Sequence, residues 1–362
     1  NSGNTAISEY ATQGALGKYV YYFGTTEQSA MGYLPTELAN NQLGWERTEE
    51  YNVGVDFGFL NNRINGSIDG YVRNTDDLLM KRNLPITTGY EFTWQNVGKT
   101  RNSGVEIALN TVPVVTKDFK WTVDLTFGYN KNEIVELFNG KEDSPGNKWF
   151  IGEPLYIERL YKYIGVWQKG EEEEAARYGR EPGNPKIEDV NNNGVYDEGD
   201  LHTFNKIPKW TAGLSTGLYY KNFDLNVYFY TRQKYGQVLG VLTDEAGSTR
   251  YNHLNVDFWT PDNPSNTCPK PAITNPQELL TSSDYAYRDL SFIRLKNINV
   301  GYTLPKEISK KFYSEKFRMY FMVENPYTWT KSDYVGLDPE NCNAYTDHRP
   351  LTSFVFGVNA TF

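Results

Sequence analysis

The stretch with the most explicit chemistry runs over residues 189–200, where oxygen-bearing side chains recur at short intervals. Positions 1, 3, 5, 9 and 12 of this stretch carry Asp or Asn, and the sixth position is Gly194, which suits a sharp turn. Calcium is held by about six to eight oxygen ligands, and one loop with this spacing can supply most of them. We therefore predict a structural calcium ion that pins this loop. The candidate ligands are Asp189, Asn191, Asn193, the Val195 carbonyl, Asp197 and Asp200.

The same stretch departs from EF-hand and dockerin-type calcium loops at its last position. Asp200 stands where those loops have a bidentate glutamate, so one ligand oxygen is lost or replaced by water. The alternative is an asparagine- and glycine-rich turn that is capped by its own side chains and holds no metal.

Patterns for covalent catalysis occur only in unsuitable places. Residues 213–217 match the G-x-S-x-G nucleophile pattern, which requires a strand-to-helix turn, but here the pattern lies inside a strand that leads into a hairpin. The histidines, His202, His253 and His348, lack the spacing of a zinc site or a catalytic triad. We therefore expect that the chain is not an enzyme.

Four aromatic residues assigned to the long loops are candidates for contact with a ligand. Their rings can stack on sugar rings or peptide groups. The competing interpretation is that aromatic loop residues pack within their own loop. The four are Tyr161, Trp167, Trp259 and Trp329.

The two cysteines, Cys268 and Cys342, are too few for a disulfide scaffold. They fall in consecutive long loops that are expected on the same side of a membrane. In a compartment that permits disulfides, such loops can bring two Cα atoms within the ~4.4–6.8 Å that a bridge requires. We predict a disulfide between them.

The elements that must position these residues are β-strands, because apolar and polar side chains alternate with a period of two. From Phe119 to Asn130, apolar residues occupy the odd positions, and polar residues or glycine occupy the even ones. Helical periodicity is confined to two short stretches, near residues 171–178 and 306–312. The alternation recurs at residues 51–59, 223–229 and 354–362.

Nine long strands are predicted, and most exceed the about 9–11 residues that a tilted strand needs to cross a bilayer. In the seventh strand the apolar phase slips between Leu295 and Ile298, which indicates a β-bulge near Lys296 or a local irregularity. The strands cover residues 45–58, 62–79, 95–113, 118–136, 208–220, 223–234, 286–304, 316–330 and 350–362.

Short and long connections alternate along the chain, as they do in outer-membrane barrels with short periplasmic turns and long extracellular loops. A soluble β-sandwich, the alternative, has no reason to segregate its loops in this way. We therefore predict an all-β fold, a transmembrane antiparallel β-barrel over residues 45–362, with residues 1–44 as the end of an extracellular loop. The other extracellular loops are predicted near residues 80–94, 137–207, 235–285 and 331–349.

Nine strands would leave two open edges, whose backbone N–H and C=O groups have no partners in hydrocarbon. The predicted strands are therefore expected to be only part of a larger barrel.

Composition agrees with a membrane barrel and excludes other classes. Aromatic residues make up 15% of the chain, and Tyr and Trp accumulate at bilayer interfaces. No stretch approaches the about 18 consecutive apolar residues of a transmembrane helix. The net charge of −9 argues against nucleic acid as a partner.

Longer motifs extend this pattern over nearly the whole chain. They lie at residues 43–48, 53–63, 74–79, 96–98, 102–106, 258–264, 291–305 and 336–340. In these motifs, and in the terminal Phe362, the sequence resembles the SusC/RagA family of TonB-linked (TonB-dependent) outer-membrane transporters of Bacteroidetes.

This resemblance implies a barrel of about 22 strands closed by an N-terminal plug, of which these would be the last nine. It also implies import of oligosaccharides or peptides across the outer membrane, with a SusD-like surface lipoprotein as partner and TonB as the source of energy. The plug and the TonB-contacting segment do not occur in this sequence, so this portion alone is not expected to transport. The alternative is an outer-membrane barrel for surface binding or adhesion without active import.

Overall fold

The computed structural model of the protein describes residues 16–23, 28–35, 37–90, 92–240, 242, 257–271, 276–336, 338–341 and 350–362. The chain divides into two compact units. The first comprises residues 1–53, 70–104 and 131–155, and the second comprises residues 54–69, 105–130 and 156–362. Among the described residues, no helix has the length and apolar character needed to cross a membrane.

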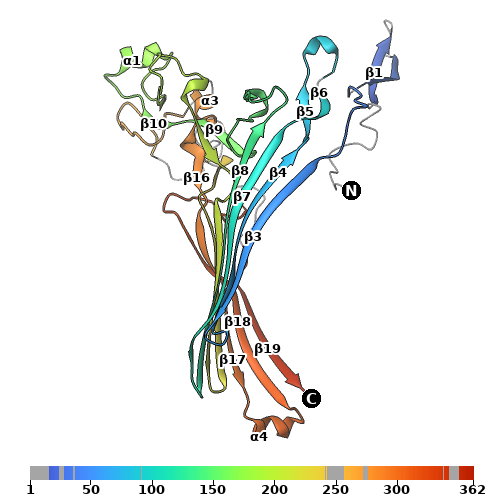
Figure 1. Ribbon diagram of the computed structural model, residues 1–362. Helices are drawn as coiled ribbons and strands as arrows, with labels where there is room; N and C mark the ends of the chain where they lie inside the picture. Colours follow the sequence, from blue (N-terminus) through green and yellow to red (C-terminus); the bar gives the residue numbers. More distant parts are fainter. Residues whose placement is uncertain are drawn as a thin grey trace. The chain divides into compact units, whose positions relative to one another are not determined.

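Nine long strands form one sheet in the order β19-β18-β17-β14-β13-β8-β7-β4-β3, so each strand lies beside its neighbours along the chain (Figure 1). This confirms the predicted set of nine long strands. Their bounds are β3 Arg47–Phe59, β4 Ile64–Asp76, β7 Lys99–Val115, β8 Phe119–Glu136, β13 Trp210–Tyr220, β14 Phe223–Gln233, β17 Phe292–Thr303, β18 Lys316–Thr330 and β19 Ser353–Thr361.

Three predicted strands were too long, and the backbone shows why. Asp77 has a φ of 57° and separates β4 from β5 (Leu79–Asn83), while Gly98 has a φ of 106° and separates β6 (Phe92–Asn96) from β7. A positive φ breaks the extended conformation of a strand. The seventh predicted strand is divided for a different reason: β16 (Tyr287–Asp289) pairs with β15 (Gly236–Val238), whereas β17 pairs with β14.

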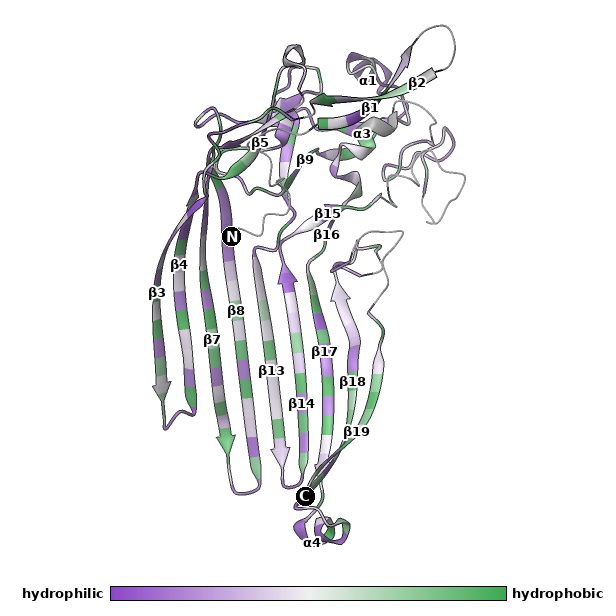
Figure 2. Ribbon diagram, turned by 90° about the vertical axis from the view of Figure 1, so that its right-hand side faces the viewer, coloured by the Kyte–Doolittle hydropathy of each residue, from purple (hydrophilic) through white to green (hydrophobic). Residues whose placement is uncertain are grey.

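The two faces of the sheet differ in polarity along the register, as the alternating colours of the strands show (Figure 2). Leu125 of β8 lies opposite Leu214 of β13, which lies opposite Phe229 of β14. The next residue along β8, Thr126, lies opposite Gly213, which lies opposite Tyr230. The predicted alternation therefore produces one apolar and one polar face, called below the apolar face and the polar face.

Side chains on the apolar face are exposed in the isolated chain. Phe354 and Phe356 of β19 expose 70% and 71% of their surface. Burying such a side chain contributes about 1.5–3 kcal/mol, so a face of this kind requires apolar surroundings. A bilayer core provides such surroundings.

The predicted β-bulge is confirmed in β17. Tyr228 of β14 pairs with Asn297, whereas the next residue, Phe229, pairs with Leu295, so Lys296 is the extra residue. The insertion returns Ile298 to the apolar face after Leu295 and accounts for the slip in the sequence pattern.

Smaller elements lie in the predicted loops of each unit. The first unit contains two hairpins, β1 (Leu16–Phe23) with β2 (Gln28–Pro35) and β5 with β6, and a cluster of Met80, Ile134 and Leu137. The two predicted helices are confirmed as α1 (Glu172–Arg177) and as α4 (Lys306–Ser309) followed by η5 (Lys310–Phe312), but a further helix, α3 (Pro276–Thr281), was not predicted. In the second unit, the paired strands are β9 (Ile157–Tyr161) with β12 (Leu201–Asn205), β10 (Tyr163–Val166) with β11 (Pro185–Ile187), and β15 (Gly236–Val238) with β16.

Candidate functional site

The acidic stretch at residues 189–200 connects β11 to β12 and is closed by its own hydrogen bonds. The Asp189 carboxylate accepts from the backbone N–H groups of Asn193 and Gly194 at 3.2 and 2.9 Å, and from the Tyr178 hydroxyl at 3.0 Å. Burial opposes ionisation, but these hydrogen bonds outweigh it and hold the pKa of Asp189 below its usual value. The charged form of Asp189 is thus stabilised by the loop itself.

Asp200, at the other end of the stretch, caps backbone N–H groups of the loop. Its side chain is fully buried, and its two oxygens accept from the N–H groups of Val190 at 2.8 Å and Asp197 at 3.0 Å. Asp197 in turn caps the short helix η3 (Glu198–Asp200) through the N–H of Gly199 at 2.7 Å. Asp200 therefore serves as one half of a capping box, in which two side chains satisfy each other's backbone donors.

The remaining predicted ligands face one another within the same loop. The amide nitrogen of Asn193 donates to Asp197 at 2.7 Å, and that of Asn191 does so at 3.4 Å. The N–H of Val195 donates to the Asn193 side-chain oxygen at 2.8 Å. The structure thus gathers the predicted side chains, although their oxygens are engaged with donors of the loop.

These contacts correspond to the self-capped turn that the sequence also allowed. Within the part of the chain that the structure describes, no three His, Cys, Asp or Glu side chains form a group that could hold a metal ion. Asp200 is the poorest ligand of the set because both of its oxygens are buried and hydrogen-bonded. The calcium ion stays a prediction.

Three of the candidate aromatic residues pack inside the loops. Trp167 is 1% exposed and stacks on Tyr178 with ring centroids 5.9 Å apart, while Lys186 Nζ lies 4.1 Å from the Trp167 centroid. Tyr161 is part of the same cluster through Tyr196. Burial raises the pKa of Tyr196 to about 12.

Trp259 is also buried, at 5% exposure, and its indole N–H donates to Gln168 at 3.0 Å. The structure does not support stacking of Trp167 or Trp259 on a ligand, because their ring faces are covered by their own loops. The competing interpretation, packing within the loop, describes both residues.

Trp329 lies at the end of β18 and belongs to the apolar face. It pairs with Ile293 of β17, is 46% exposed, and contacts the rings of Phe229 and Tyr327. Trp329 therefore lies in a strand and not in a loop, with its side chain on the opposite side of the sheet from the polar face.

Cys268 is buried, and its sulfur accepts a hydrogen bond from the Tyr285 hydroxyl at 3.3 Å. Burial raises the pKa of the thiol. Its predicted disulfide partner, Cys342, lies outside the described residues, as do His253 and His348. The disulfide therefore stays a prediction. The remaining histidine, His202, is described, and its Nε2 lies 3.3 Å from a carboxylate oxygen of Glu188.

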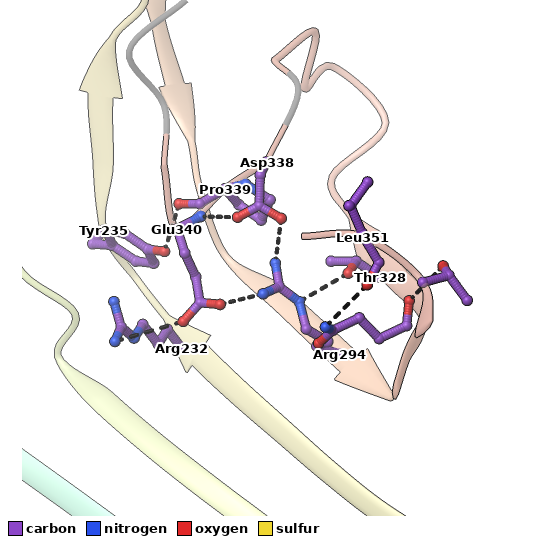
Figure 3. Close-up of polar contacts among 10 residues, drawn as sticks. Arg232, Tyr235, Arg294, Thr328, Asp338, Pro339, Glu340 and Leu351 are labelled. Carbon is purple, nitrogen blue, oxygen red and sulfur yellow. Dashed lines mark hydrogen bonds and ion pairs between the residues drawn. The ribbon is translucent and has the colours of Figure 1, made fainter. Parts of the chain in front are cut away.

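One buried and extensively paired charge, Arg294, was not singled out by the sequence. Arg294 of β17 is 1% exposed and lies on the polar face. Its side chain points toward Asp338 and Glu340 (Figure 3). Its guanidinium contacts Asp338 at 2.5 Å, pairs with Glu340, and donates to the Thr328 hydroxyl at 3.0 Å. Burying a guanidinium is costly unless it is fully paired, and these three partners satisfy that condition.

Two further contacts hold the loop segment at residues 338–340 against the sheet (Figure 3). Arg232 of β14 approaches Glu340 at 3.6 Å, and the Tyr235 hydroxyl donates to the Pro339 carbonyl at 3.0 Å. Together with Arg294 they form the loop clamp, defined here as Arg232, Tyr235, Arg294, Asp338 and Glu340. The clamp fixes the loop after β18 against the polar face.

Arg294 and its acidic partners lie in two of the sequence motifs, residues 291–305 and 336–340. Each contains one side of the pair, but 44 residues separate Arg294 from Asp338. Neither periodicity nor local spacing shows that two such distant residues meet.

The chain is similar in sequence to known outer-membrane receptors. A profile of the family described as "TonB dependent receptor-like, beta-barrel" matches residues 8–325. TonB-dependent receptor P3 of Formosa agariphila is 32% identical over 100% of this chain. TonB-dependent receptor SusC of Bacteroides thetaiotaomicron is 30% identical over 94% of it.

Solved structures superpose on nearly the whole chain. The RagAB peptide transporter does so with a TM-score of 0.76, 26% identity and 99% coverage of this chain. The RagAB peptide importer in its "open-open" state gives a TM-score of 0.75, 26% identity and 100% coverage. In the order named, the chain spans only 38% and 34% of the two receptors and 40% and 39% of the two solved chains.

Proposed function

Because this chain belongs to the family of TonB-dependent receptor-like β-barrels of the outer membrane, we propose that it is part of a SusC/RagA-type importer of oligosaccharides or peptides. The observation that carries the proposal is the nine-stranded sheet with one apolar and one polar face. A lipid-facing surface and a polar inner wall are what a transport barrel needs. The family comprises receptors for transport, not enzymes, in agreement with the G-x-S-x-G pattern lying inside β13.

Substrate passage would follow the polar face. Thr126 and Tyr230 lie on this face, where their hydroxyl groups can bind the polar groups of a sugar or a peptide backbone. The similar RagAB structures are described as those of a peptide transporter, which favours a peptide as the first substrate to test.

A surface lipoprotein of the SusD type is the proposed partner, with TonB as the energy source acting through the rest of the protein. The support is the likeness to RagAB and to SusC over nearly the full chain. Co-purification of the full-length protein from outer membranes should recover such a lipoprotein in stoichiometric amount.

The test of import uses cells that carry the full-length gene, a deletion, or the full-length gene in a TonB-deficient background. Labelled oligopeptides and oligosaccharides are offered separately, and intracellular label is measured. Import predicts uptake of one class, lost in both the deletion and the TonB-deficient cells. Surface binding that persists without TonB, with no internal label in any cells, would instead establish the adhesion alternative.

We also propose that the loop at residues 189–200 takes up calcium. Asp189, Asn191, Asn193 and Asp197 already face one another, so rotation of two amide groups would turn their oxygens inward beside the Val195 carbonyl. The Asp200 carboxylate would keep its buried capping role and give no direct ligand.

Terbium luminescence on the full-length protein, with calcium as competitor, tests this site. The rings of Tyr178 and Tyr196 are stacked with their centroids 4.6 Å apart, and they can sensitise the luminescence of a lanthanide bound in the loop. The double variant Asp189→Asn/Asp197→Asn should lose the calcium-displaceable signal. The control Glu173→Gln/Glu174→Gln removes the same charge from α1 and should retain it. An unchanged signal in the first variant would leave only the self-capped turn.

A further inference from the structure

The connection between β17 and β18 differs from the tight turns at the same end of the sheet. β13 and β14 are joined by Lys221 and Asn222 alone, whereas β17 and β18 are joined by a segment that contains α4 and η5. Figure 1 shows α4 beyond the ends of β17 and β18. Residues 305–316 are called the basic turn below.

The basic turn is held firmly by two buried serines. Ser309 is 1% exposed and its hydroxyl donates to the Leu304 carbonyl at 3.3 Å. Ser314 is 3% exposed, and its hydroxyl contacts the carbonyls of Lys316 and Thr361, each at 2.7 Å. The exposed side chains of the turn are therefore presented from a fixed backbone.

The turn projects on the side of the apolar face. Phe312 stacks on Phe317 with ring centroids 5.4 Å apart. Phe317 is in phase with Met319 and Phe321 of β18, and Phe321 pairs with the exposed Phe356 of β19. Phe312 thus continues the apolar face past the end of the strands.

Other apolar groups of the turn are exposed as well. Ile308, Phe312 and Tyr313 expose 42%, 55% and 91% of their surface. Tyr313 has a φ of 53°, a left-handed conformation that glycine or asparagine adopts at lower cost. The backbone of Tyr313 caps η5, with its N–H donating to the Lys310 carbonyl at 3.1 Å, whereas its ring is left exposed to solvent.

The charge of the turn is opposite to that of the chain. Lys306, Lys310, Lys311 and Lys316 against Glu307 and Glu315 give 4 − 2 = +2, while the whole chain carries −9. All four lysines are exposed, and within the described residues no salt bridge involves any of them.

We propose that the basic turn binds anionic phospholipid headgroups of the periplasmic leaflet of the outer membrane. Ile308, Phe312 and Tyr313 enter the boundary between headgroups and acyl chains, and the lysines pair with lipid phosphates. Aromatic rings and lysines together are suited to this boundary. The inference rests on the outer-membrane assignment and on the short turns being periplasmic, and it does not depend on import or substrate.

The first experiment measures depth with the full-length protein in nanodiscs of phosphatidylethanolamine and phosphatidylglycerol. A spin label is placed at Tyr313→Cys, and a matched label at Asn222→Cys in the tight β13–β14 turn. The label at 313 should be more accessible to oxygen and less accessible to a water-soluble nickel complex than the label at 222. Equal accessibility of the two labels to the nickel complex would overturn the proposal.

The second experiment measures retained phosphatidylglycerol by native mass spectrometry. Lys310→Gln/Lys311→Gln should lower retention by about fivefold for each charge removed, whereas Lys117→Gln/Lys221→Gln at the tight turns should change it little. Equal losses in both variants would indicate only a general effect of charge and would contradict a site at the basic turn. Peptide or sugar uptake should be unaffected, so a failure of this proposal is distinguishable from a failure of the import proposal.

Discussion

At the scale of single residues, Arg294 shows how much a buried charge depends on its partners. Its guanidinium is enclosed by Asp338, Glu340 and Thr328, and neither of its acidic partners is nearer than 44 residues in sequence. Position 294 faces the polar side, since it lies between Ile293 and Leu295 of the apolar face. The identity of its partners follows from tertiary packing, which sequence periodicity does not encode.

Removing this guanidinium should destabilise the clamp strongly. Arg294→Met leaves the buried Asp338 carboxylate without its countercharge, and breaking such a pair costs about 3–5 kcal/mol. Limited proteolysis of the full-length protein should then cut the loop near residue 340 much faster. The control Arg232→Gln removes a half-exposed partner at 3.6 Å and should cost about 1 kcal/mol or less. Equal cleavage in the two variants would show that the clamp does not hold the loop.

The cysteines give a second prediction at this scale. Cys268 is buried, and a bridge to Cys342 would tie together the loops before and after β17 and β18. Thiol titration of the denatured, unreduced full-length protein should find neither of these two sulfurs reactive. If both cysteines are alkylated without prior reduction, as mass spectrometry of their peptides would reveal, the bridge does not form.

At the scale of elements, the strands were predictable because a period of two survives along each of them. The strand from Phe119 to Glu136 was predicted within one residue at its start. Breaks at Asp77 and Gly98 were missed because a single positive φ interrupts the pairing without changing the polarity pattern. The sequence also left open whether the loop aromatics contact a ligand or pack within their own loop. Trp167 is buried by Tyr178 and Lys186 from other parts of the loop, and the polarity pattern does not show such contacts.

The phase of β8 gives a test with a matched control one residue away. An arginine at Leu125 would be placed on the apolar face, where a charge near the bilayer midplane costs about 2–4 kcal/mol. An arginine at Thr126, which is an exposed position, would point to the polar face opposite Gly213. Folding of the full-length barrel into lipid vesicles, followed by heat-modifiable mobility in gels, should be impaired only by Leu125→Arg. Equal impairment would mean that the faces are reversed or that both are buried in protein.

At the scale of the whole molecule, turn length and membrane side are expected to correspond. The tight turns at Asn61 and Lys221 have positive φ values of 56° and 52°, whereas the opposite strand ends carry the long loops. Because outer-membrane barrels keep their short turns in the periplasm, the two ends should differ in access from outside the cell.

Cysteine labelling of intact cells measures this access. An impermeant maleimide should react with Asp262→Cys, which is exposed in a long loop, and not with Asn61→Cys until the outer membrane is permeabilised. Asp262 is a better reporter than its neighbour Trp259, which is buried. Comparable labelling of both sites on intact cells would invert the topology proposed here.

The order of the strands also bears on how this protein can diversify. β8 ends at Glu136 and β13 begins at Trp210, so 210 − 136 − 1 = 73 residues separate two strands that lie side by side. The entropy of closing a loop grows only with the logarithm of its length, and doubling that length would cost about 0.6 kcal/mol. Insertions and deletions in this loop should therefore change the stability of the nine-stranded sheet only a little. Related proteins can therefore differ in the length and sequence of this loop while the register between β8 and β13 stays unchanged.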